Sequence, residues 1–236
     1  MARYNEGMGQ STAASQVQIS CQGVLFDMDG ILISSLGSVE RSWTKWAKMR
    51  GVDPEYAISV VHGRRAIDSV RRLRPDLDAE AELKIIEDFE VEDNDGLVVL
   101  PGVLDLLRAL PAHRWTVVTS ATERLARVRM ADGGVPVPER LVTAERVTHG
   151  KPHPEPFLAG AALLGFAPGE CVVFEDSASG AQAGRNAGCT VVATTFSHPA
   201  DELKAAHYLV PDLSVMRVEQ TPGDGGMVLR FTPLAR

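Results

Sequence analysis

The pattern of apolar and polar residues divides the chain into a helical region and an alternating region. Between residues 35 and 97, apolar side chains recur at steps of three and four residues, as at Val39, Trp43 and Trp46. This spacing places them on one face of a helix and predicts amphipathic helices through the region. Two further helices within it are expected over residues 65–73 and 78–91.

The region after Pro101-Gly102 is built differently, because short continuous apolar runs alternate with helical stretches. Strands are expected at 23–26, 115–119, 141–143, 171–175, 190–194 and 207–210. Helices are expected at 102–110, 122–131, 154–164, 178–187 and 200–205. Strands that are apolar throughout and alternate with helices are typical of a parallel sheet covered on both faces. The pattern therefore predicts an α/β protein with a Rossmann-like, doubly wound parallel sheet.

The first strand precedes the helical region, yet its apolar character assigns it to the same sheet. The helical region is therefore an insert, and we expect an α/β core from residues 21–34 and 101–236 with a helical cap from residues 35–100. The polar residues 1–20 are expected to be a flexible tail. Residues 221–236 are expected to form a loop and a short strand that pairs with a sheet edge.

Composition and charge restrict the class of partner. The 236 residues carry a formal net charge of −7 and no basic cluster apart from a short arginine-rich stretch, which argues against nucleic acid. No apolar run reaches the length of a membrane span, and no secretory signal is visible. The three cysteines are widely spaced and predict neither a disulfide framework nor a zinc motif. We expect a cytoplasmic protein that binds a small molecule, as a monomer or, alternatively, a dimer.

The most informative chemistry is the pair Asp27 and Asp29, which directly follows the apolar run 24–26. Two carboxylates held close together raise each other's proton affinity and cost stability unless a cation or a reaction partner offsets them. Gly30 and the apolar run 31–33 indicate a tight turn and a second strand. Both aspartates are therefore expected at the carboxyl end of a strand, where open α/β sheets bind ligands. There they can hold a divalent metal, or one can attack an electrophile while the other moves protons.

Further polar residues are expected at the same edge, because the strands of a parallel sheet all end there. They are Thr119, Ser120, Lys151, Glu175 and Asp176. A phosphate monoester is a dianion, so an aspartate can approach it only when positive charge lies nearby. Asp176 can supply the additional carboxylate that Mg²⁺ needs, and the ion can offset both negative charges.

The same residues predict a route for phosphoryl transfer. Lys151 adds a positive charge for the phosphoryl oxygens, and Thr119 or Ser120 can donate hydrogen bonds to them. Asp27 can then attack phosphorus and form an aspartyl phosphate. Asp29 can protonate the leaving oxygen and later deprotonate the hydrolytic water.

These segments stand in the order of the four motifs of the haloacid dehalogenase-like phosphohydrolases, which the chain resembles from about residue 22 to residue 218. The helical insert resembles their type-one cap. Three stretches resemble more specifically the glycerol-phosphate and 2-deoxyglucose-6-phosphate phosphatases: Ser42–Trp46, His62–Arg65 and Gly150–Phe157. That resemblance implies a small sugar or polyol monophosphate as the substrate.

The resemblance also implies individual roles. Asp27 would be the nucleophile and Asp29 the acid and base. Mg²⁺ would bind the Asp27 carboxylate, the Asp29 backbone carbonyl and the Asp176 carboxylate, with Glu175 as a ligand through water or directly. The phosphate-binding residues it implies are Ser120 and Lys151. Asp29 favours phosphoryl chemistry, because the dehalogenases proper lack this second aspartate.

The cap residues leave alternatives open. His62 and Arg65 are candidate substrate contacts, but helix capping or packing explains them equally well. Trp43 and Trp46 are expected in the core of the cap rather than as a platform for a sugar.

Two histidines flank the candidate phosphate-binding lysine. His149 and His153 are four residues apart, as on one face of a helix. Pro152 and Pro154 make a helix unfavourable there. We therefore expect loop residues that help orient Lys151 rather than a zinc-binding pair.

The first alternative to a phosphatase is a phosphosugar mutase on the same scaffold. The β-phosphoglucomutases carry a cap histidine where this chain has Val39, and an arginine near Ala66. Both differences argue against a mutase, which must hold and turn over a bisphosphate. A second alternative is a binding protein that keeps the fold without catalysis.

Overall fold

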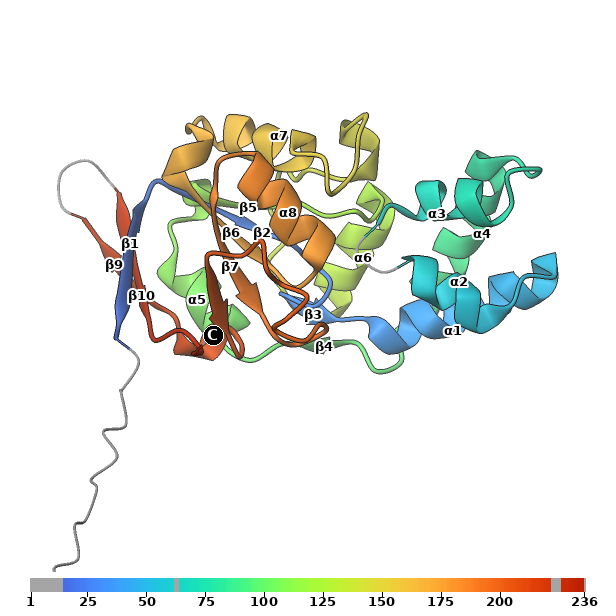
Figure 1. Ribbon diagram of the computed structural model, residues 1–236, viewed down its shortest axis with the longest axis horizontal. Helices are drawn as coiled ribbons and strands as arrows, with labels where there is room; N and C mark the ends of the chain where they lie inside the picture. The colour runs from blue at the N-terminus through green and yellow to red at the C-terminus, as the bar shows by residue number, and fades with distance from the viewer. Residues whose placement is uncertain (1–14, 62–63, 222–225, 236) are drawn as a thin grey trace, which may run out of the picture.

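The molecule consists of a sheet-based core with a group of helices beside it (Figure 1). The computed structural model describes residues 15–61, 64–221 and 226–235. The core contains a parallel sheet of five strands. Their order is β5 (Trp115–Val117), β2 (Gly23–Phe26), β6 (Cys171–Glu175), β7 (Thr190–Thr194) and β8 (Tyr208–Val210).

Alternate side chains of the strands pack into two separate hydrophobic clusters, one on each face of the sheet. Phe26 and Phe174 point to one face, where their rings stack with centroids 5.2 Å apart. Leu25 and Val173 point to the other face. Helices α5 (Val103–Ala109) and α6 (Glu123–Asp132) cover the first face, and α7 (Glu155–Leu164) and α8 (Ala178–Asn186) cover the second. The predicted doubly wound α/β fold is confirmed.

A second sheet joins the two ends of the chain. It is antiparallel, in the order β1 (Val17–Cys21), β10 (Met227–Phe231) and β9 (Arg217–Gln220). The expected tail therefore ends earlier than residue 20, while residues 1–14 lie outside the described part of the chain. The terminal strand was expected at a sheet edge, and instead it is the middle strand of this small sheet. Alternation in β1 places polar residues between apolar ones, so its composition resembles that of a tail.

The helices beside the sheet form the cap. They are α1 (Leu36–Arg50), α2 (Pro54–Val61), α3 (Ala66–Leu73) and α4 (Ala79–Glu92). Their apolar faces meet in a cluster of their own. Trp43 and Trp46 are 2% and 0% exposed there, with ring centroids 5.4 Å apart, so the prediction that both belong to the core of the cap is confirmed.

The two chain segments that connect the core to the cap lie side by side. Strand β3 (Ile33–Ser34) pairs with β4 (Val98–Val99), with Ile33 opposite Val99. The predicted strand over 31–33 is wrong for its first two residues, because the backbone N–H groups of residues 31–33 all donate to the Met28 carbonyl and form a turn. Its apolar character reflects burial in the turn, not a strand.

Two other short elements differ from prediction. Residues 200–205 form turns instead of a helix, and Val142 makes an isolated bridge to Val118 in place of a strand over 141–143. In both cases tertiary contacts bury a short apolar segment without regular structure. Short 3₁₀ helices complete the described elements: η1 (Ala112–Arg114), η2 (Ala144–Arg146), η3 (Pro168–Glu170) and η4 (Leu213–Val215).

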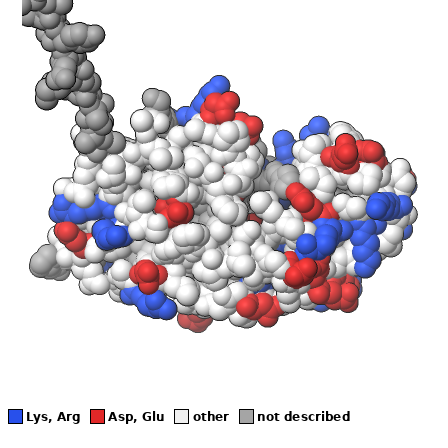
Figure 2. All heavy atoms as spheres, turned by 90° about the horizontal axis from the view of Figure 1, so that it is seen from below, with Lys and Arg blue, Asp and Glu red and all other residues white. Residues whose placement is uncertain are grey.

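The surface carries charges of both signs. Figure 2 shows one face of the molecule, on which basic and acidic side chains are interspersed. Within the described ranges, the helices are too short or too polar to cross a membrane.

Candidate active site

The predicted site residues meet where the strands of the parallel sheet end. Asp27 follows β2, Thr119 and Ser120 follow β5, and Asp176 follows β6. They line a cavity between this edge and the cap, together with Asp29. Cap side chains from α1, α2 and α4 close the opposite wall, among them Trp43, Val61, Glu87 and Glu90.

Lys151 lies at the centre of a buried network of charges. Its Nζ is 2.9 Å from Oδ1 of Asp27 and 2.5 Å from Oε1 of Glu175. Burial opposes the charge of this ammonium, yet the two carboxylates raise its pKa above the ordinary value. Lys151 is therefore held as a cation directly beside the candidate nucleophile.

Glu175 is fully enclosed, and the protein occupies both of its oxygens. Oε1 bonds Lys151, while Oε2 accepts from the backbone N–H groups of Asp176 and Ser177 at 2.9 and 3.0 Å and from the Ser177 hydroxyl at 3.0 Å. Burial disfavours its charge, but Lys151 and these hydrogen bonds lower its pKa overall. In this geometry Glu175 fixes the position of Lys151 and the start of α8.

Asp176 faces Asp27 across the turn that contains Gly30. Burial raises the pKa of Asp176 well above its ordinary value, and the charges of Glu175 and Asp27 raise it further. Gly30 has a φ of +79°, and a Cβ there would lie 1.8 Å from Oδ2 of Asp176. The Ser197 hydroxyl donates to the same oxygen. A glycine is required here because both the backbone conformation and the space exclude a side chain.

The carboxyl groups at this edge form a candidate metal site. Asp27, Glu175 and Asp176 each place one oxygen within 4.8 Å of the others. Burial raises the pKa of Asp27 to about 7, Lys151 counters part of that effect, and Glu175 adds to it. Three buried carboxyl groups face one ammonium, an arrangement with the oxygen ligands that a divalent cation prefers.

Thr119 and Ser120 follow β5, the strand beside β2, and line the same cavity as the aspartates. The backbone N–H of Thr119 donates to the Val142 carbonyl at 2.9 Å, and its Oγ1 accepts from the Ala121 N–H at 3.1 Å. The Thr119 hydroxyl therefore shapes the turn after β5. Ser120 is half-buried and lines the cavity, where its hydroxyl can reach a ligand.

Asp29 is held apart from Lys151 by other partners. Its Oδ1 accepts from the Ser35 hydroxyl and, at 3.0 Å, from a guanidinium N–H of Arg129. Its side chain is 33% exposed and lines the cavity. A carboxyl group at the cavity wall, oriented by two donors, has the placement that an acid and base requires.

Arg129 was missed by the sequence analysis. It lies on α6 with a side chain 3% exposed, and its second terminal nitrogen is 3.7 Å from Oε2 of Glu90 on the cap. Nε and that nitrogen have no hydrogen-bond partner among the described residues. Burial raises the pKa of Glu90 to about 7, which Arg129 partly offsets. One feature of the sequence could have identified Arg129: it shares a helical face with the apolar residues Leu125, Ala126 and Met130, where a charged residue is unusual.

Two residues of the cap, His62 and Arg65, were candidate substrate contacts. His62 lies outside the described residues. Arg65 donates to Asp68 at 2.7 Å and to the Val147 carbonyl at 3.0 Å, with a side chain 12% exposed, so it connects the cap to the loop that carries Lys151. Its neighbour Arg64 contributes to the cavity wall.

Comparison with known proteins agrees with this geometry. A model of the haloacid dehalogenase-like hydrolases matches residues 21–188. The chain is similar to hexitol phosphatase A of Escherichia coli, with 39% identity over 215 residues that cover 89% of this chain and 99% of the relative. It is similar to glycerol-1-phosphate phosphohydrolase 2 of Saccharomyces cerevisiae, with 33% identity and 89% of each chain covered.

Solved structures share the architecture. A β-phosphoglucomutase of Clostridium difficile superposes with a TM-score of 0.70 at 22% identity, covering 82% of this chain and 92% of that one. At this identity the likeness concerns the fold alone. The family model, by contrast, spans the strand ends that carry Asp27 and Asp176 and the loop that carries Lys151. The chain belongs to the haloacid dehalogenase-like hydrolase family.

Proposed function

We propose that the protein is a phosphatase that hydrolyses a small sugar or polyol monophosphate through an aspartyl phosphate. The observation that carries the proposal is the buried contact of Asp27 with Lys151, which Glu175 supports from behind. Such an arrangement presents a nucleophile and a phosphate-binding cation at one point. The names of the curated relatives, a hexitol phosphatase and a glycerol-1-phosphate phosphohydrolase, support the same reaction and substrate class.

Mg²⁺ fits the carboxyl groups of this site. Their raised pKa values show that burial without a cation disfavours their charge. Carboxylate and carbonyl oxygens are also the ligands that Mg²⁺ prefers. Asp27, Asp176 and the backbone carbonyl of Asp29 would hold the ion, while Glu175, whose two oxygens already bond Lys151 and the start of α8, would act by positioning Lys151. When bound, the ion offsets the negative charge of the phosphate group and of its attacking carboxylate.

The protein's own groups account for the proton and phosphoryl movements. Lys151 and Ser120 bind phosphoryl oxygens, while the Thr119 hydroxyl shapes the turn after β5. Asp27 attacks phosphorus, so an Oδ–P bond forms as the ester P–O bond breaks, and Asp29 donates a proton to the leaving oxygen. Water then attacks phosphorus, Asp29 takes its proton, and the Oδ–P bond breaks to release phosphate.

The cavity walls support a hydroxylated substrate. Cap residues Glu87 and Glu90 present carboxyl groups, which can accept hydrogen bonds from hydroxyl groups. Arg65 positions the loop that carries Lys151 and does not contact the substrate, because its guanidinium donates hydrogen bonds to Asp68 and to the Val147 carbonyl.

The mutase alternative receives less support. Val39 stands where mutases carry a histidine, and Ala66 lies near the position of their arginine; both line the cavity with small aliphatic side chains. They offer no hydrogen bond to a second phosphate group. A phosphatase needs no such contact, because water completes its reaction.

We infer the organisation of the protein from the same features. The separate cluster of cap side chains supports a cap of residues 35–100 on a core of residues 21–34 and 101–236. The pairing of β3 with β4 supports a hinge between them. We also infer a monomer in the cytoplasm whose partner is a small molecule rather than nucleic acid or a membrane; the described cysteines are free, which agrees with a reducing compartment.

The test is release of inorganic phosphate from a panel of phosphorylated hexitols, glycerol, hexoses and deoxyhexoses, with Mg²⁺ and with EDTA. We expect Mg²⁺-dependent release that is concentrated on a few members. Formation of an isomer of glucose 1-phosphate with a bisphosphate activator, without free phosphate, would favour the mutase. Mg²⁺ binding without turnover of any ester would favour the binding protein.

A further inference from the structure

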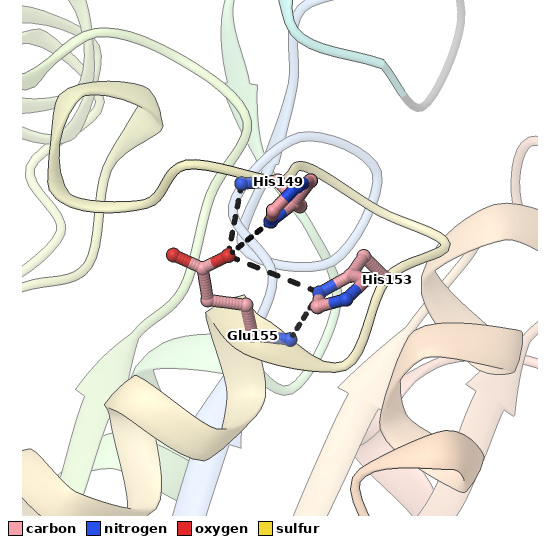
Figure 3. Close-up of side chains that lie close together, drawn as sticks. All are labelled: His149, His153 and Glu155. Carbon is pink, nitrogen blue, oxygen red and sulfur yellow. Dashed lines mark hydrogen bonds and ion pairs between the residues drawn. The ribbon is translucent and has the colours of Figure 1, made fainter.

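A second group of metal-ligating side chains lies on the loop that carries Lys151, outside the cavity. His149 and His153 come from the two ends of this loop, and Glu155 comes from the first turn of α7 (Figure 3). The three side chains converge: the two rings lie next to each other with centroids 4.6 Å apart, and Oε2 of the carboxylate faces Nδ1 of both. The loop brings the histidines together although the prolines keep it from being a helix.

The ligand atoms have separations that suit one metal ion. Oε2 of Glu155 is 2.9 Å from Nδ1 of His149 and 3.9 Å from Nδ1 of His153. One atom from each residue lies within 4.8 Å of the others. Neighbouring ligands of a tetrahedral Zn²⁺ with bonds of about 2.1 Å are about 3.4 Å apart, so the two measured separations lie on either side of that value.

The charge and hydrogen bonding of the group favour coordination. Glu155 accepts from the backbone N–H groups of Thr148 and His149 at 2.6 and 2.9 Å, and these bonds lower its pKa to about 2. Its carboxylate is therefore ionised at neutral pH. The backbone N–H of Glu155 points at Nδ1 of His153 at 3.2 Å, which leaves this nitrogen without a proton.

We propose that His149, His153 and Glu155 bind a transition-metal ion of the Zn²⁺ type at a surface site separate from the acidic cluster of the cavity. Two imidazoles and one carboxylate suit Zn²⁺, Ni²⁺ or Cu²⁺ better than Mg²⁺, which prefers oxygen ligands throughout. Both histidines are exposed, so water can complete the coordination sphere. The ion would displace the proton on Nδ1 of His149 and the weak hydrogen bond to His153.

The position of this metal site predicts an effect on the loop that carries Lys151. Lys151 lies between the two histidines in sequence, and its ammonium is bound on the inner side of the loop to Asp27 and Glu175. A metal ion on the outer side would link both ends of the same short segment. We therefore expect it to restrain this loop and to raise the midpoint of thermal unfolding.

Glu155 also has a role without a metal, because it accepts the two backbone N–H groups that precede Gly150. Glu155→Gln removes the charge but keeps only one of these two hydrogen bonds, because Oε1 and Oε2 each accept one N–H and an amide has a single oxygen, so the two histidine variants carry the test. His149→Ala and His153→Ala remove one ligand each. His113, an exposed histidine of η1, provides the matched control His113→Ala.

The test is calorimetric titration of the full chain with Zn²⁺ in millimolar Mg²⁺, with thermal melts of each variant. We expect micromolar binding that weakens by about tenfold or more in His149→Ala, His153→Ala and Glu155→Gln and is unchanged in His113→Ala. The stabilisation by Zn²⁺ should disappear in the same three variants. The proposal is overturned by the absence of Zn²⁺ binding, or by binding that survives these changes and is lost in Asp176→Asn.

Discussion

The two walls of the cavity differ in how they are held. On the core side, Asp27, Lys151 and Glu175 are buried and bind one another directly, so their positions are fixed before a substrate arrives. On the cap side, α4 meets the core through Arg124, which bonds Glu87 at 2.8 Å and Asp88 at 2.6 Å at the surface. In the proposed phosphatase, chemistry that needs preorganised charge would therefore lie on the rigid wall, and substrate recognition would lie on the cap wall.

The largest expected effect concerns the rigid wall. Asp27→Asn removes the nucleophilic carboxylate while keeping its size, so turnover should fall by roughly 10⁴-fold or more. Phosphate release by the purified variant measures it, and retained release would contradict the assignment of Asp27. A circular dichroism spectrum close to that of the wild type is the control that the variant keeps its fold.

Lys151→Met should cost stability as well as activity. It leaves Asp27 and Glu175 buried without their shared cation, so we expect the free energy of unfolding to fall by about 3–5 kcal/mol. Urea denaturation measures the change. The control is Lys84→Met on the cap, whose ion pair with Asp88 is exposed to solvent and should contribute little to stability. Equal losses in both variants would contradict a rigid wall that depends on Lys151.

Arg129 links the two walls, because it contacts Asp29 on one and approaches Glu90 on the other. Arg129→Met should lower kcat by about 10–100-fold, which is part of the effect of a positioned acid and base, and should change the pH profile. Arg129→Lys should restore part of kcat. The matched control is Arg127→Met on the same helix, which removes a half-exposed pair with Glu123. A change in KM alone would indicate a role in substrate binding instead of positioning.

The smallest effect concerns the interior of the cap. A hydrogen bond from Arg50 and one from Trp46 lower the pKa of Glu82 below its ordinary value of 4.5. A depressed pKa stabilises the fold above pH 4.5, and this contribution is lost as the pH falls through the lowered value. Glu82→Gln should therefore reduce stability by about 1 kcal/mol at neutral pH, and the difference should vanish in acid. Urea denaturation at several pH values measures it. A difference that does not shrink as the pH is lowered from neutrality would contradict the electrostatic origin.

Local pattern was sufficient for most of the fold. The strands over 171–175 and 190–194 and the helices of the cap follow from runs and periods of apolar residues. The site motifs could also be located, since each follows a strand that is recognisable by itself. The exceptions were short segments, such as 31–32 and 200–205, whose apolar residues are buried in turns. Their length is too small for a period to distinguish a strand or a helix from a buried turn.

The small antiparallel sheet could not be predicted as such. Val17 pairs with Phe231, more than two hundred positions away along the chain, and neither strand reveals its partner. The contact between Arg129 and Glu90 has the same origin, because α6 and α4 belong to different parts of the chain. The convergence of His149, His153 and Glu155 depends on how a proline-rich loop folds back.

By itself, the sequence determined which segments are strands and helices and which strand ends carry reactive groups, because these properties depend on neighbouring residues. The tertiary structure alone decided which charges are buried together. It placed Lys151 between Asp27 and Glu175, turned Arg129 toward Asp29, and left Arg65 bound to the Lys151 loop. Burial and distance set the strength of an electrostatic interaction, and both arise only when distant segments pack.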